Sequence, residues 1–208
     1  MIDYIHAVML WLAVFAPSSA LASLLVKRGK TFAVTGMQGT LLILSLVLIA
    51  FLQIPLSFRP LYLLQAVLLG FSLSLLLNWV EQLLTRRVEV PEFLPEGLPW
   101  RVLLLLILAP LAEEALNRGL VESYLLSHGY LWGAIILSAV LFALPHWMAF
   151  EKTSLGERTF VTAGAFVMGV TVAYLFALSG SLLTAFTFHS SANFGGLLIA
   201  HLRIGQRS

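Results

Sequence analysis

The sequence predicts an all-α integral membrane protein, a polytopic bundle of about seven transmembrane helices. Hydrophobic residues make up 60% of the 208 residues, and charged residues make up only 11%. A soluble globular domain is nearer half apolar and about a quarter charged. This composition provides more apolar surface than one core of ordinary size can bury, so the excess must face lipid.

Seven hydrophobic segments support this prediction. A helix needs roughly 20 mostly apolar residues to cross the hydrocarbon core of a bilayer. The predicted spans are residues 5–26, 36–54, 61–84, 101–126, 130–150, 159–179 and 181–202. The first span is preceded by Asp3 and by no Lys or Arg, so we expect a retained span rather than a cleaved signal peptide.

The longest connection divides the predicted spans into two groups. It runs from Thr85 to Trp100 and carries three prolines and alternating charges. We therefore expect an N-terminal region of three spans at residues 1–90 and a second region of four spans at residues 100–208.

Basic residues sort to one side of this seven-span arrangement. Ten of the 12 Lys and Arg flank the connections of one side: Lys27, Arg28, Lys30, Arg86, Arg87, Arg101, Lys152, Arg158, Arg203 and Arg207. Arg59 lies on the other side, and Arg118 lies inside a span. Because Lys and Arg are enriched in cytoplasmic loops, we expect an external N-terminus and a cytoplasmic C-terminus.

Charge and cysteine content exclude several functions. The net charge is +2, but the basic residues form short clusters between apolar runs instead of a continuous face, so we expect no nucleic-acid partner. The chain has no cysteine, which excludes disulfides, thiolate nucleophiles and Cys-ligated metals.

The fourth span contains ionisable side chains, which are costly in hydrocarbon and are each a hypothesis about function. Glu114 and Arg118 are four residues apart, so a helix places them on one face in the favourable order for an ion pair. Such a pair can also serve only to staple the helix. Glu113 points about 100° away around the helix. It has no cation within reach on its own helix, which suits a general base.

Two later spans also carry polar side chains. His146 in the fifth span, taken alone, is more often a packing histidine, although Pro145 beside it frees a backbone carbonyl and bends the helix. His189 and Asn193 share a face of the seventh span, where one such pair can be interhelical hydrogen-bond glue. Polar groups on three separate helices favour a functional site, so we expect Glu113, His146, His189 and Asn193 to border one cavity.

These residues resemble the CAAX-protease and bacteriocin-processing (CPBP, ABI-type) family of intramembrane glutamic proteases. Three motifs carry the resemblance, which covers about residues 100–200: Glu113-Glu114 followed by Arg118, Phe142 four residues before His146, and His189 four residues before Asn193. Asn117 and Pro145 depart from the usual pattern of the family. The first three spans match only in being hydrophobic.

The resemblance implies a catalytic core at residues 100–208 and a metal-independent endopeptidase without a cofactor, in the cell membrane of a prokaryote. Its partners would be a peptide or lipidated protein substrate and membrane lipid, with the oligomeric state left open. By the same resemblance, Glu113 and His146 would activate a water, and His189 and Asn193 would stabilise the oxyanion. The residues implied to shape the site or bind substrate are Glu114, Arg118 and Phe142.

Two alternatives stay open. A zinc intramembrane protease also uses Glu and His, but the sequence has no His-Glu-x-x-His motif, and two His with Glu make a sparse ligand set. A non-catalytic membrane scaffold or a bacteriocin-immunity protein would keep the polar site for folding or binding. A Glu113→Gln variant distinguishes an enzyme from this second alternative, because a scaffold should tolerate the substitution.

Overall fold

The structure, a computed structural model, describes residues 1–85 and 97–204. It is all-helical, and no strand occurs in this described part of the chain. This confirms the all-α prediction. The helical architecture follows from the bilayer as solvent, because a backbone in hydrocarbon has to satisfy its own N–H and C=O groups.

Seven helices cross the molecule. Six of them are α1 Ile2–Leu25, α2 Lys30–Phe51, α3 Leu63–Thr85, α7 Leu131–Ala149, α8 Leu155–Ser179 and α9 Leu182–Ile204. The other, here called the central helix, runs over residues 98–127. It consists of α4 Leu98–Leu103, the π-helix η2 Leu104–Leu108, α5 Ala109–Glu114, the π-helix η3 Ala115–Glu122 and α6 Ser123–Ser127.

The seven predicted spans correspond to these seven helices in order. Five helices are long and apolar enough to cross a membrane: α1 with the turn that follows it, α2, α3, α7 and α8. The central helix and α9 carry most of the polar side chains of the candidate site. The chain is thus a membrane protein.

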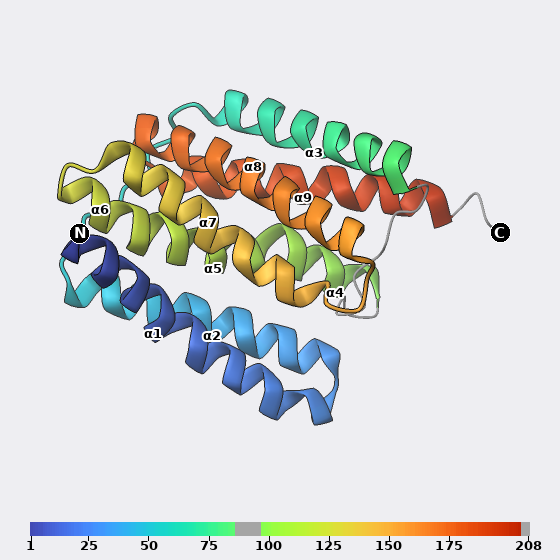
Figure 1. Ribbon diagram of the computed structural model, residues 1–208, viewed down its shortest axis with the longest axis horizontal. Helices are drawn as coiled ribbons and strands as arrows, with labels where there is room; N and C mark the ends of the chain where they lie inside the picture. Colours follow the sequence, from blue (N-terminus) through green and yellow to red (C-terminus); the bar gives the residue numbers. More distant parts are fainter. Residues whose placement is uncertain (86–96, 205–208) are drawn as a thin grey trace.

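The helices run along a common direction, and successive helices alternate in sense (Figure 1). The chain begins at one end of the bundle, and α9 finishes at the opposite end. The turn between α1 and α2, which contains Lys27 and Arg28, lies at the same end as the connection between α7 and α8, and the connection between α2 and α3 lies at the other end. The side chains of Arg86, Arg87, Arg203 and Arg207 lie outside the described residues.

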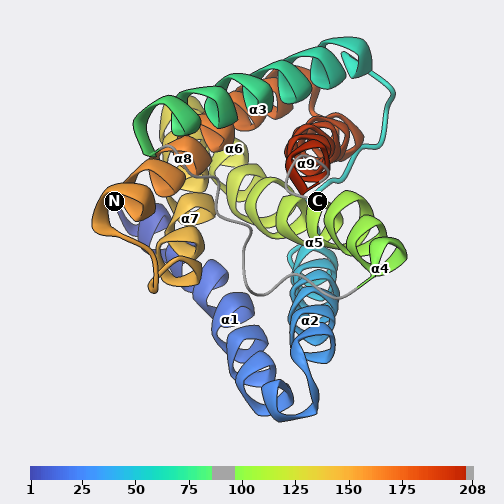
Figure 2. The same cartoon turned by 90° about the vertical axis from the view of Figure 1, so that its right-hand side faces the viewer.

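The central helix is surrounded by most of the others. The α1–α2 hairpin packs on one side of it, whereas α9, α8 and α3 lie on the opposite side, and α7 also contacts η3 (Figure 2). As a result, Glu114, Arg118 and Glu122 have no exposed surface at all. The helix that carries the acidic motif is therefore the platform on which the candidate site is built.

Helix α3 packs closely along α9. A Cβ atom on Gly70 of α3 would overlap the carbonyl oxygen of Phe188 in α9. Only glycine permits this approach, because any side chain would push the two backbones apart. The contact joins the predicted N-terminal region to the helix that carries His189 and Asn193.

We therefore expect Gly70→Ala to destabilise the protein by about 1–3 kcal/mol, the usual cost of overpacking. The measurement is the thermal unfolding midpoint in detergent. Gly39→Ala on α2 is the control, because its Cβ would meet nothing within 4 Å and alanine favours a helix by about 1 kcal/mol over glycine. Equal midpoints for the two variants would contradict the close approach of α3 and α9.

Candidate active site

The central helix departs from α-geometry just before the acidic motif. Pro110 has no N–H, so it cannot donate a hydrogen bond to the carbonyl of Leu105 or Leu106. Side chains of α9 take over this role: Asn193 Nδ2 donates to Leu105 O at 2.8 Å, and Ser190 Oγ donates to Leu106 O at 2.8 Å. These bonds fix the register of α9 on the central helix.

Glu114 forms the centre of the buried polar network. Its Oε2 lies 3.2 Å from Arg118 Nε, which confirms the predicted ion pair. Its Oε1 lies 2.7 Å from His189 Nδ1, so α9 is tied to the same carboxylate. Arg118 in turn donates from Nη2 to the carbonyl of Gly169 on α8 at 2.7 Å, and its Cζ lies 4.8 Å from the ring centroid of Phe142. Glu114 thus joins three helices.

A further buried carboxylate extends this network to α7. Glu122 Oε2 accepts a hydrogen bond from Ser138 Oγ at 2.9 Å and lies 3.9 Å from Arg118 Nε. The sequence places Glu122 in the same span, but no motif of the family contains it. The spacing in the sequence could have identified it. Glu114 and Glu122 lie four residues before and after Arg118 on one helix, so both carboxylates can approach that arginine.

Glu113 points in a different direction from Glu114 around the central helix, as its position on the helix predicts. Its Oε1 accepts a hydrogen bond from Gln38 Nε2 of α2 at 2.9 Å, and its Oε2 lies 3.9 Å from His189 Nε2. A quarter of its side chain is exposed, whereas Glu114 is fully buried. Sequence reasoning missed Gln38, and its only signal was an isolated amide within an apolar span.

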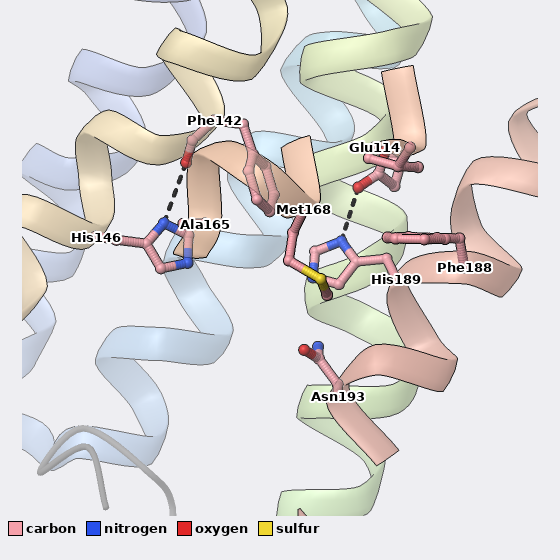
Figure 3. Close-up of a pocket in the computed structure, with 9 residues that line it drawn as sticks. Glu114, Phe142, His146, Ala165, Met168, Phe188, His189 and Asn193 are labelled. Atoms are coloured by element: carbon pink, nitrogen blue, oxygen red, sulfur yellow. Dashed lines mark hydrogen bonds and ion pairs between the residues drawn. The ribbon is translucent and has the colours of Figure 1, made fainter. Parts of the chain in front are cut away.

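His146 is oriented by its own helix. Its Nδ1 lies 3.1 Å from the carbonyl oxygen of Phe142. Because a carbonyl only accepts, Nδ1 carries the hydrogen and Nε2 is the acceptor of the neutral ring. The Phe142 ring lies between the two imidazoles, with centroid distances of 5.3 Å to His146 and 5.4 Å to His189. Figure 3 shows this arrangement.

The candidate residues border two cavities. The larger, of about 90 Å³, is lined by Glu114, Phe142, His146, Ala165, Met168, Val172, Phe188, His189 and Asn193. The smaller, of about 50 Å³, has twelve lining residues, among them Gln38, Glu113, Asn117, Phe142 and His146. The residues expected to border one cavity are thus divided: Glu113 lines the smaller cavity, His189 and Asn193 line the larger one, and His146 lines both. Phe142 and His146 line both cavities, so the two cavities adjoin at these side chains.

Within residues 1–85 and 97–204, no three His, Asp or Glu side chains gather in an arrangement that could hold a metal ion. Glu114 is paired with Arg118, and Glu113 accepts a hydrogen bond from Gln38.

Comparison with protein families identifies part of the chain. The family model of Rce1-like type II CAAX prenyl endopeptidases matches residues 95–195. The matched segment contains all seven candidate residues and excludes Gln38. Neither the curated proteins nor the solved structures contain a match to this chain. The resemblance inferred from the three motifs is thus confirmed, because residues 95–195 match the model of the Rce1-like family of type II CAAX prenyl endopeptidases.

Proposed function

We propose that this protein is an intramembrane endopeptidase in which Glu113 and His146 activate a water molecule. The observation that carries the proposal is that these two side chains border the same 50 Å³ cavity. A cavity needs only about 10–15 Å³ to hold one water. Glu114, by contrast, is neutralised by Arg118 and His189 and is fully buried. Glu113 is therefore the carboxylate that can receive a proton.

The proposed reaction is the hydrolysis of a peptide bond. Glu113 and the Nε2 of His146 accept a proton from the water as its oxygen bonds to the carbonyl carbon. The C=O electron pair moves onto the carbonyl oxygen and gives a tetrahedral intermediate. The C–N bond then breaks, and the leaving amine receives the proton that was taken from the water. General acid–base catalysis of this kind requires groups within hydrogen-bond reach of the reacting water, which suits two side chains on one small cavity.

The larger cavity suits the developing oxyanion. His189 is held through Nδ1 by Glu114, so its Nε2 faces the site and donates when the ring is protonated. The amide nitrogen of Asn193 carries two hydrogens and uses one of them on Leu105. Donors fixed in advance at a site of low dielectric constant stabilise such a charge effectively.

The family points to a class of substrate. Its description as CAAX prenyl endopeptidase supports a prenylated C-terminal segment of a membrane-associated protein as the substrate. We further propose that no metal takes part, and that the protein lies in the cell membrane of a prokaryote with its N-terminus outside. A non-catalytic scaffold and a zinc protease are the alternatives that the following experiment separates.

The activity test uses purified protein in lipid vesicles and a fluorescence-quenched peptide that ends in a farnesylated CAAX sequence. We expect cleavage by the wild type, and a rate lower by about 10²–10⁴-fold in Glu113→Gln, since the variant keeps the shape of the side chain and removes the base. The same peptide without the farnesyl group tests the lipid requirement. Loss of activity in chelator, restored by zinc, would indicate the zinc enzyme, and equal signals from wild type and Glu113→Gln would indicate the scaffold.

The two adjacent glutamates should differ in stability as well as in activity. Glu114→Gln leaves the fully buried Arg118 without its closest carboxylate, a fault worth about 3–5 kcal/mol. We expect Glu114→Gln to lower the thermal midpoint and the yield, and Glu114→Gln combined with Arg118→Met to recover part of both. Glu113→Gln, the matched control, should unfold like the wild type. A stable, inactive Glu114→Gln beside an active Glu113→Gln would reverse the assignment.

The orientation is tested with reporter fusions. The α1–α2 and α7–α8 connections lie at one end of the bundle, and α9 finishes at the same end, so fusions after Lys30 and after Ser208 should both report a cytoplasmic location. A fusion after Arg59 should report an external one. An external signal at Ser208 would mean that the number of membrane crossings is even.

A further inference from the structure

We propose that Gln38 of α2 is the positioning residue for Glu113, an inference that rests on the proposed function of Glu113 as the base. Gln38 Nε2 lies 2.9 Å from Glu113 Oε1. The amide side chain is 8% exposed and lines the cavity that Glu113 and His146 share. Gln38 lies outside the segment that matches the family, so α2 adds to the site a group that the family motifs do not contain.

The polarity of this contact follows from the chemistry of the two groups. An ionised carboxylate only accepts hydrogen bonds, so the NH₂ end of the amide faces it. The opposite atom, Gln38 Oε1, is buried and has no hydrogen-bond partner among the described residues. Burying an unpaired amide oxygen costs free energy. The contact with Glu113 is thus the interaction that holds this amide in the apolar interior.

The hydrogen bond also sets the direction of the carboxylate. With Oε1 held by Gln38, the second oxygen of Glu113 lies 3.9 Å from His189 Nε2. The Glu113 side chain is partly exposed and has several rotatable bonds, so it would otherwise sample other rotamers. A carboxylate held in one orientation is already placed to accept a proton from the bound water, so less conformational entropy is lost when the reaction begins.

Other charged or titratable groups lie near Glu113 and have to be considered in a pH measurement. They are Glu114 and Arg118 on the same helix, His189 on α9 and His146 on α7. Helix α1 contributes Trp11 and Phe15 to the shared cavity, and neither side chain carries a charge. Of the groups that α2 brings to this cavity, only Gln38 is a hydrogen-bond donor in the described structure.

The rival explanation is that Gln38 merely holds α2 to the central helix. Two substitutions of similar size distinguish the roles. Gln38→Met removes the donor, and Gln38→Glu replaces it with a second acid that has to share a proton with Glu113. Ser45→Ala is the control, because Ser45 is buried on the same helix and its hydroxyl has no hydrogen-bond partner among the described residues.

We expect kcat on the farnesylated peptide to fall about 10–100-fold in Gln38→Met, the range for a lost hydrogen bond to a charged group, with KM little changed. The acidic limb of the pH–rate profile should move to higher pH in Gln38→Met and further in Gln38→Glu. Ser45→Ala should match the wild type in both. A purely structural role would lower the thermal midpoint and the yield without this ordered shift of the acidic limb.

A second measurement needs no turnover. Difference infrared spectroscopy follows the protonation of the Glu113 carboxyl, which the Glu113→Gln spectrum identifies. The titration should move to higher pH in Gln38→Met. An unchanged titration would overturn the role of Gln38, whether or not the peptide is cleaved. A wild-type protein that fails to cleave the peptide while its Glu113 titration responds to Gln38→Met would instead refute the proposed function and leave the positioning contact established.

Discussion

The buried carboxylate of Glu114 is the constraint on which the rest of the structure depends. A charge at bilayer depth is tolerated only when it is paired and hydrogen-bonded. Arg118 on the same helix and His189 on α9 provide this compensation. Arg118 also needs the Gly169 carbonyl of α8, and the absence of a side chain there lets α8 approach Ala139 of α7, since a Cβ would lie 3.1 Å from its Cα. One ion pair thereby fixes the positions of three helices around the central one.

The position of Glu113 follows from this constraint. Adjacent residues of a helix point about 100° apart, so once Glu114 faces α9, its neighbour has to face the α1–α2 hairpin. A carboxylate that is turned toward another helix needs another partner, and α2 supplies Gln38. The two acids therefore serve opposite requirements. Glu114 is fully buried and paired with Arg118 and His189, whereas Glu113 stays partly exposed beside a cavity.

The sequence predicted the features that depend on local order. The spans follow from hydropathy and the Glu114–Arg118 pair from spacing, and both are confirmed. The π-helical segment η2 was not predictable, because the carbonyls that it leaves near Pro110 find their partners on α9. A single cavity was expected because sequence gives no rotamer for Phe142, whose side chain lines both cavities. The division at residues 85–100 stays a prediction, and the Gln38 contact crosses it.

The irregular helix has a consequence for the proposed chemistry. A proline in a membrane helix leaves carbonyls that need donors from neighbouring helices, because no water is present to satisfy them. Asn193 donates a hydrogen bond to one such carbonyl. Because a carbonyl accepts hydrogen bonds only from the NH₂ end of an amide, this contact also fixes the orientation of the Asn193 side chain. In the proposed mechanism the second hydrogen of that nitrogen stabilises the oxyanion. The requirement to satisfy a backbone carbonyl in lipid would then orient a catalytic donor in advance, and the low dielectric constant of the interior would strengthen its effect.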